Sequence, residues 1–269
     1  MASKLFNRDA LGNLILFKRV IFMAFGAIAN ARFRKLFNTE LRGTEIIRQL
    51  PLKNVLFVSN HQTYFADVTM MLIAISSAKN GFKDKVGPLY HLLNANFRVY
   101  FVAANETMKK SLLTKAMTKA GGILVQRTWK KEGRSTSLKV DTTDSDTIGK
   151  ALTDGWVITF PQGTTTPFVK GRKGTAHIIK KNKPLVVPVV IDGFRRSFDK
   201  KGLLVKKKGA TISMTFKPAL NINYDDDLDT ILNQVMHSIE QSEEFYPEKL
   251  KKEIAKKEAK KEVKKKPQE

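Results

Sequence analysis

The sequence predicts an α/β protein with a largely parallel sheet flanked by helices and with an N-terminal amphipathic helix that associates with a membrane. Short apolar runs without helical spacing alternate with helical stretches, which is typical of parallel strands joined by crossover helices. The chain has 269 residues, enough for one large domain with a substantial core. It carries 48 Lys and Arg against 25 Asp and Glu, a net charge of +23 that indicates an anionic partner.

The first predicted element is a helix over Leu11–Ala31, with an apolar face formed at helical spacing by Leu14, Phe17, Ile21, Phe25 and Ile28. Lys18 and Arg19 interrupt this face. The uninterrupted apolar run Val20–Ala29 is far shorter than the ~20 residues of a transmembrane helix, and no small-residue cleavage site follows it. We expect a helix in the headgroup layer whose cations meet anionic lipid. An ordinary helix packed on the domain and a secretory signal are the alternatives.

The rest of the chain divides into predicted strands and helices in alternation. The predicted strands cover Val55–Ser59, Val99–Ala103, Gly121–Arg127, Trp156–Thr159, Leu185–Ile191 and Thr211–Phe216. The predicted helices cover Asp67–Lys79, Glu106–Ala120, Thr143–Thr153, Gly174–Lys181 and Asp226–Ser242. We therefore divide the chain into a membrane-associating region (1–40), an α/β domain (41–246) and a Lys/Glu-rich tail (247–269). The tail is expected to be a solvated helix or a disordered segment.

A histidine and a carboxylate follow the first buried strand, Val55–Ser59. His61 comes two residues after this strand and Asp67 six residues later, at a strand end where α/β proteins often place their chemistry. Histidine can accept and return a proton near neutral pH, and an aspartate can hold one ring nitrogen so that the other accepts. No serine or cysteine nucleophile elbow lies beside the pair. The simplest chemistry is direct deprotonation of a substrate hydroxyl; a purely structural hydrogen bond is the alternative.

Three more segments follow in a fixed order. Gly121–Arg127 delivers an arginine at the end of a short strand, Phe160–Thr166 follows an apolar strand, and Leu185–Ile191 is a strand that contains a proline. Together with Asn60–Asp67 they resemble the four sequence blocks of the glycerol-phosphate and lysophosphatidate acyltransferase family. That family's pattern is Asn-His-x4-Asp, Gly-x-x-Phe-Ile-x-Arg, Phe-Pro-Glu-Gly-Thr and a Val-Pro-hydrophobic strand. The resemblance spans Val55 to Ile191.

The resemblance implies an O-acyltransferase of membrane phospholipid biosynthesis. Such an enzyme moves a fatty acyl group from acyl-carrier protein or coenzyme A, as co-substrate, to a lysolipid hydroxyl, here that of 1-acylglycerol-3-phosphate. It implies His61 as the base and Asp67 as its orienting partner. The substrate-binding residues are then Asn60, Arg127 on the acceptor's phosphate, Gln162, Gly163 and Thr164 near the oxyanion, and Lys173 as a further cation.

Two departures from the family pattern affect the chemistry. Five residues separate His61 from Asp67 where the family has four, so the pair can meet only if the loop bulges. Gln162 stands in place of the family's glutamate, and Thr165 in place of an arginine that often follows Gly-Thr. These departures leave two alternatives open: O-acylation of a non-glycerol lysolipid such as a lyso-aminolipid, and a catalytically weak lipid-binding relative.

Composition limits the cofactors and partners. Cysteine is absent, which excludes disulfides and thiolate zinc sites and fits a reducing compartment. The four histidines have no metal-ligand spacing, so we expect no metal and no cofactor. The basic charge suits anionic lipid or nucleic acid, and no nucleic-acid-binding module is recognisable. We expect a peripheral protein on the cytoplasmic face of the membrane; a basic nucleic-acid-binding protein is the alternative.

Overall fold

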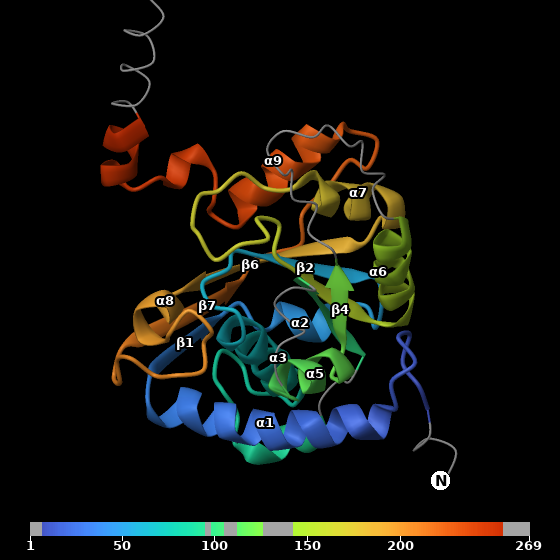
Figure 1. Cartoon of the computed structure of the whole chain (residues 1–269), viewed down its shortest axis with the longest axis vertical. Helices are drawn as coiled ribbons and strands as arrows, with labels where there is room; N and C mark the ends of the chain where they lie inside the picture. Colours follow the sequence, from blue (N-terminus) through green and yellow to red (C-terminus); the bar gives the residue numbers. More distant parts are fainter. Residues whose placement is uncertain (1–6, 95–97, 105–111, 126–141, 255–269) are drawn as a thin grey trace, which may run out of the picture.

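A seven-stranded sheet forms the centre of the molecule (Figure 1). The computed structural model describes residues 7–94, 98–104, 112–125 and 142–254. The strands are β1 (Asn38–Arg42), β2 (Val55–Ser59), β3 (Val99–Ala104), β4 (Gly122–Val125), β5 (Trp156–Thr159), β6 (Leu185–Asp192) and β7 (Thr211–Phe216). Their order in the sheet is β1-β7-β6-β2-β5-β3-β4, and all neighbours pair in parallel except β6 and β7. The predicted largely parallel sheet is confirmed.

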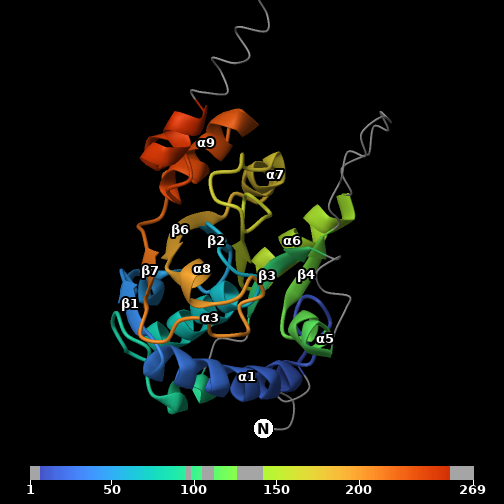
Figure 2. The same cartoon turned by 60° about the vertical axis from the view of Figure 1, so that its left-hand side comes forward.

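Helices cover both faces of this sheet (Figures 1 and 2). They are α1 (Ile15–Lys35), α2 (Ile46–Gln49), α3 (Ala66–Lys79), η2 (Leu89–Asn94), α5 (Leu112–Lys119), α6 (Thr142–Asp154), α7 (Lys173–Asn182), α8 (Phe194–Ser197), α9 (Leu228–Ser238) and η3 (Glu243–Phe245). Helices α1, α3 and α5 lie on one face, and α6, α7 and α9 lie on the other. The predicted α/β class is therefore confirmed.

The alternation of side chains along β2 divides the core into two clusters. Val55 and Phe57 pack in the cluster that contains α3, whereas Leu56 and Val58 pack in the cluster that contains α6, α7 and α9. All four side chains are fully buried. A strand buried on both faces must be apolar at every position, which explains why its sequence shows a continuous apolar run and no alternation.

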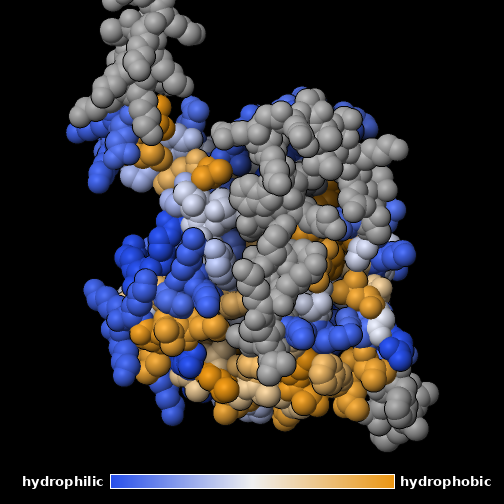
Figure 3. All heavy atoms as spheres, in the orientation of Figure 1, coloured by the Kyte–Doolittle hydropathy of each residue, from blue (hydrophilic) through white to orange (hydrophobic). Residues whose placement is uncertain are grey.

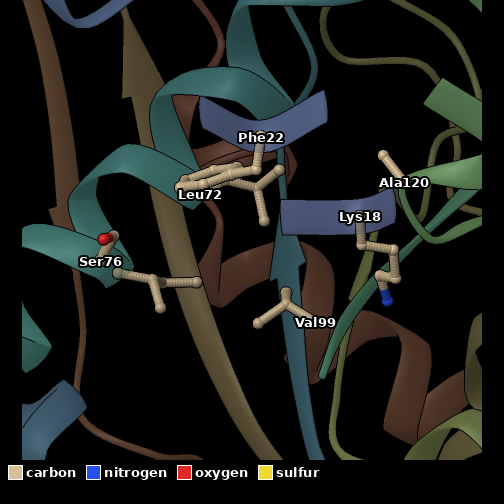
Figure 4. Close-up of a pocket in the computed structure, with 7 residues that line it drawn as sticks. Lys18, Phe22, Leu72, Ser76, Val99 and Ala120 are labelled. Carbon is tan, nitrogen blue, oxygen red and sulfur yellow. The ribbon is translucent and has the colours of Figure 1, made fainter. Parts of the chain in front are cut away.

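The predicted N-terminal helix is present as α1, and its inner side packs on the domain. Figure 4 shows Lys18 and Phe22 of α1 facing Leu72 of α3 and Val99 of β3 around a small cavity of about 30 Å³. The Lys18 ammonium is buried and lies 2.9 Å from a carboxylate oxygen of Asp9. Burial lowers the pKa of Lys18, while the hydrogen bond that its ammonium donates to Asp9 acts to raise it. Lys18 thus points into the protein and does not interrupt an outward face as the sequence suggested.

The outer side of α1 is apolar. The exposed large apolar side chains of this helix, each between 44% and 56% exposed, are Leu16, Phe17, Val20, Phe25 and Ile28. Of the predicted apolar face, Ile21 alone is classed as buried. Figure 3 shows the apolar residues gathered along the edge that α1 forms. Within the described part of the chain, no helix is long and apolar enough to cross a membrane.

Several elements differ from the sequence prediction: α1 covers Ile15–Lys35 and not Leu11–Ala31, and the short helices α2, η2, α8 and η3 were not predicted. Strand β1 was not predicted, because it is a polar edge strand in which only Leu41 is buried. The predicted helix Glu106–Ala120 is described only as α5, and residues 105–111 lie outside the described residues. Most of the predicted tail, 255–269, also lies outside them.

Candidate active site

Three neighbouring strands end at the same edge of the sheet. β5, β2 and β6 are adjacent and parallel, so their carboxyl ends meet. Phe160 follows β5, His61 follows β2 and Gly193 follows β6. Sequence blocks separated by more than a hundred residues are thereby brought to one place.

His61 and Asp67 form the predicted pair. Nδ1 of His61 lies 3.0 Å from Oδ2 of Asp67, which is fully buried at the start of α3. The same carboxylate accepts hydrogen bonds from the amides of Gln62 (2.5 Å) and Thr63 (3.1 Å) and from the Thr63 hydroxyl (2.6 Å). These donors satisfy the buried carboxylate oxygens and fix the orientation of the side chain. Because it can only accept, it requires a proton on Nδ1 and leaves Nε2 as the basic nitrogen.

The extra residue between His61 and Asp67 is accommodated by a loop that a second segment braces. The amides of Tyr64 and Phe65 donate to the carbonyls of Lys200 (3.1 Å) and Lys201 (2.9 Å). The next residue, Gly202, has φ +78° and approaches so closely that a Cβ there would lie 2.6 Å from the Ala66 nitrogen. The bulge that the spacing required is therefore formed, and it is held from outside the loop.

The His61 ring is held by a stacked aromatic side chain as well as by its hydrogen bond to Asp67. It stacks on Phe160 with ring centroids 4.0 Å apart and an interplanar angle of 23°. Its side chain is 13% exposed, so a substrate group can still reach it. Neither Phe160 nor the Thr63 hydroxyl was singled out from the sequence, since both are defined only by long-range packing or by the turn of the loop.

Gln162 is buried, and its amide nitrogen makes two hydrogen bonds. Its Nε2 donates to the Val169 carbonyl at 3.0 Å and to Oε1 of Gln241 at 3.1 Å. Oε1 of Gln241 also accepts from the Phe168 amide at 2.9 Å. Gln162 thus ties the loop after β5 to the segment after α9, and it does so by donating, which a carboxylate in its place cannot do.

Gly163 is the residue at which this loop needs a glycine. Its φ is +61°, and a Cβ there would lie 2.8 Å from Nε of Arg172. The Gly163 amide donates to the Phe160 carbonyl at 2.9 Å, so it is committed within the turn. The Thr164 hydroxyl lies 3.3 Å from the Thr166 amide and shapes the same turn.

The other predicted binding residues have different settings. The Asn60 amide bonds both ways with the backbone of Ile191, at 2.8 Å each, and so fastens β2 to β6. Lys173 is exposed at the start of α7 and pairs with Asp229 of α9 at 2.6 Å. Arg127 lies outside the described residues.

Arg195, which the sequence did not single out, lies at this site. Its guanidinium donates to the Thr165 carbonyl, and its amide donates to Oε1 of Gln62 at 3.1 Å. Two arginines directly after β6 were a usable signal, because the carboxyl end of that strand adjoins that of β2. In the residues that the structure describes, no cluster of His, Asp or Glu side chains could hold a metal ion.

Comparisons with known proteins bear on the family and the fold of the chain. A family model described as Acyltransferase matches residues 38–192. Among solved structures, the crystal structure of the 1-acyl-sn-glycerophosphate (LPA) acyltransferase PlsC from Thermotoga maritima has a similar fold, with a TM-score of 0.52 and 18% identity. That match covers 83% of this chain and 78% of PlsC. No curated protein sequence matches the chain.

Proposed function

The chain belongs to the acyltransferase family, and from this we propose that it transfers a fatty acyl group from acyl-carrier protein or acyl-coenzyme A to a lysolipid hydroxyl, with 1-acylglycerol-3-phosphate as acceptor. The observation that carries the proposal is the hydrogen bond between His61 and a fully buried Asp67. The bond forms although the loop is one residue longer than the family pattern. It argues for an active enzyme over a weakened relative.

In the proposed reaction, Nε2 of His61 accepts the proton of the acceptor hydroxyl as its oxygen attacks the thioester carbonyl. Asp67 holds Nδ1–H and stabilises the imidazolium that forms. When the tetrahedral intermediate collapses, the imidazolium returns the proton to the leaving thiolate. General base catalysis of this kind contributes about 10²–10⁴ in rate.

The oxyanion of the intermediate needs N–H donors beside His61. Of the two predicted candidates, the Gly163 amide is committed to Phe160, so we assign this part to the Thr164 amide. Gln162 supports this role of Thr164, because its hydrogen bonds to Val169 and Gln241 fix the loop that contains Thr164. Asn60 and Gln162 then act on the substrate through the backbone that they hold, while Arg127 and Lys173 are proposed cations for the phosphates of the substrates.

The first experiment is an acyl-transfer assay on the purified full chain. Labelled long-chain acyl-carrier protein and acyl-coenzyme A are offered with lysophosphatidate and with other lysolipids, including a lyso-aminolipid. We expect a diacyl product from lysophosphatidate, and a loss of about 10²–10⁴ in rate in His61→Ala.

The matched control is His177→Ala, because His177 is an exposed histidine on α7. Its rate should equal that of the unaltered chain. A product from a lyso-aminolipid alone would replace the acceptor that we propose. If neither the unaltered chain nor His61→Ala forms a product from any acceptor, the proposed enzymatic role is refuted.

We also propose that the outer side of α1 docks the protein on an anionic membrane, at its cytoplasmic face. Helix η2 packs against α1 and adds three exposed apolar side chains, Leu89, Tyr90 and Leu93. Three exposed cations, Arg32, Arg34 and Lys35, lie in the last turn of α1. An apolar surface beside cations suits a headgroup layer that contains anionic lipid.

Vesicle flotation tests this surface. Phe17→Ser combined with Ile28→Ser should lower the fraction of protein bound to vesicles that contain phosphatidylglycerol. Leu52→Ser is the matched control, since Leu52 is 80% exposed but lies outside α1 and η2. Equal binding of both variants and the unaltered chain would refute the docking surface.

A further inference from the structure

A second cavity, of about 360 Å³, opens next to the catalytic histidine. Gln62, which follows His61 in the chain, lines it together with Thr165 and Thr166 of the loop after β5. The opposite wall comes from the segment between β6 and β7, with Arg195, Lys200 and Lys206. The cavity is twelve times larger than the one beneath α1 and differs in its chemistry, because its three cations are exposed whereas Lys18 in the smaller cavity is buried and paired with Asp9.

The positive charge of this cavity is not neutralised from within the described chain. No ion pair joins Arg195, Lys200 or Lys206 to a carboxylate among the residues that the structure describes. Asp199 is the acidic residue in the lining, and its Oδ1 accepts from the amides of Leu203 (2.8 Å) and Leu204 (2.9 Å). Asp199 is therefore fixed within the turn, and the lining carries three cations against one carboxylate.

Arg195 is held in place for a role at this cavity. Its guanidinium is anchored on the Thr165 carbonyl and its amide on the Gln62 side chain. The next residue, Arg196, differs: it pairs with Asp192 at 3.0 Å on the exposed surface. Thr165 is the position at which the family pattern often has an arginine. A guanidinium from another part of the chain therefore reaches the backbone of that position.

We propose that this cavity binds a phosphate group of a substrate of the acyl transfer, with Arg195 as its principal contact and Lys200 and Lys206 as supporting charges. The inference rests on the proposed function. A phosphate carries two negative charges and several acceptor oxygens, which suits a planar guanidinium beside two ammonium groups and threonine hydroxyls. In lysophosphatidate the phosphate is separated from the reacting hydroxyl by few bonds, and the cavity begins at the residue after His61.

Two substrates could supply this phosphate: the acceptor, through its headgroup, or the donor, through coenzyme A or the phosphopantetheine arm. Binding measurements on the full-length His61→Ala chain separate them. A short-chain lysophosphatidate and coenzyme A are titrated separately into that protein, into His61→Ala/Arg195→Gln and into His61→Ala/Arg196→Gln. Because no acyl transfer takes place, the outcome does not depend on whether the reaction has been identified correctly.

We expect Arg195→Gln to weaken the binding of one of the two ligands by about 10- to 100-fold, the range for a charged hydrogen bond. Arg196→Gln should bind both ligands as before. If Arg195→Gln weakens the binding of lysophosphatidate, the cavity holds the phosphate of the acceptor. If it weakens the binding of coenzyme A, the cavity holds a phosphate of the donor. Monoacylglycerol, which lacks the phosphate, should bind equally to all three proteins.

Unchanged affinity for both phosphate ligands in Arg195→Gln would overturn the proposal, as would an equal loss in Arg196→Gln. Arg195→Lys covers the case in which Arg195→Gln does not fold, because lysine keeps the positive charge but lacks the planar set of N–H donors of the guanidinium. It should retain part of the affinity. Unaltered acyl transfer in Arg195→Gln, with an unchanged KM for each substrate, would refute the cavity's role and leave the proposed function intact.

Discussion

His61 and His91 lie at opposite ends of α3, and their surroundings differ in a way that separates the proposed catalytic histidine from a structural one. His61 has Asp67 at Nδ1, a stacked Phe160 on its face and 13% of its side chain exposed. His91, in η2, is fully buried. Both rings are held by hydrogen bonds, so the presence of a partner does not distinguish them.

The difference lies in the chemistry of the partners of His91. Its Nδ1 lies 2.9 Å from the hydroxyl of Ser76, and that hydroxyl donates to the His91 carbonyl, so Nδ1 carries the proton. Its Nε2 accepts from the Asn30 amide at 2.9 Å. Both nitrogens are therefore used inside the protein, with roles that require a neutral ring. Burial and the charge of Arg34 lower the pKa of His91 to about 4.

A histidine suited to catalysis thus has one nitrogen bound to a group that favours the imidazolium and one nitrogen accessible to substrate. Asp67 fulfils the first condition for His61, because it is a carboxylate and not a hydroxyl or an amide. His91 joins η2 to α1 and α3 through Asn30 and Ser76. The positions of His61 and His91 in the sequence, each beside an apolar segment, do not distinguish these two roles.

The largest effect is expected for Asp67→Asn, which removes the condition that makes His61 a base. The side-chain amide would face the four donors that now surround the carboxylate, and its NH₂ group can turn toward Nδ1. That contact would place the ring proton on Nε2, where it blocks proton acceptance. We expect kcat/KM to fall by about 10²–10⁴, equal to roughly 3–5 kcal/mol, in the acyl-transfer assay.

Asp84→Asn is the control for this variant, because Asp84 also accepts from a backbone amide and a hydroxyl, both of Thr44, at 2.9 Å. It lies beyond the other end of α3 and should change the unfolding midpoint without changing kcat/KM. A full rate in Asp67→Asn would mean that His61 does not depend on its carboxylate partner.

The second effect concerns stability and pH, and it is expected for His91. The pKa of about 4 in the folded protein is lower than the ordinary value of 6.5, so the unfolded chain binds this proton first as pH falls. The stability due to neutral His91 is complete above pH 6.5 and is lost as pH falls toward 4. The loss amounts to about 3 kcal/mol in the free energy of unfolding.

Urea unfolding at several pH values measures this loss when the unaltered chain is compared with His91→Gln. Other groups titrate in the same range, but they contribute equally to both proteins, so the difference between the two curves reports His91. That difference should shrink steadily between pH 6.5 and 4. Parallel curves would show that His91 is protonated as easily when folded as when unfolded. At pH 7, His91→Gln should keep the kcat/KM of the unaltered chain.

The sequence predicted the parts of the site that depend on short stretches of chain. The apolar runs of β2, β5 and β6 located three strands, and the resemblance at His61 and Asp67 located the hydrogen-bonded pair that we propose as catalytic. What it did not show depends on contacts between distant segments. Arg195 meets Gln62 across 133 residues of chain, and Lys200 braces the loop at Tyr64. Such contacts leave no periodic signal in the sequence. For Arg195 the usable signal was its position shortly after β6, but nothing local showed which residues it would contact.

Gln162 is the clearest case, because the sequence showed only that it stands in place of the family's glutamate. Its partner Gln241 lies 79 residues away, so the sequence could not show that this position must donate. The smallest of the three effects follows: Gln162→Glu restores the family's residue and should nevertheless destabilise the protein. The carboxylate would face the Val169 carbonyl and Oε1 of Gln241, two acceptors, at a site that is 2% exposed.

We expect the free energy of unfolding to fall by about 1–3 kcal/mol in Gln162→Glu, the cost of buried polar groups left without donors. Gln241 cannot compensate by turning its amide, because its Oε1 also serves the Phe168 amide and its Nε2 donates to the Glu240 carbonyl. The matched control is Gln234→Glu on α9: Gln234 is half-buried and its Nε2 also donates to a carbonyl, that of Asn221 at 2.9 Å, but water can replace this bond because it lies at the surface, so stability should change by less than about 0.5 kcal/mol. Equal stability of the two variants would mean that Gln162 is tolerated at this position, and not required there.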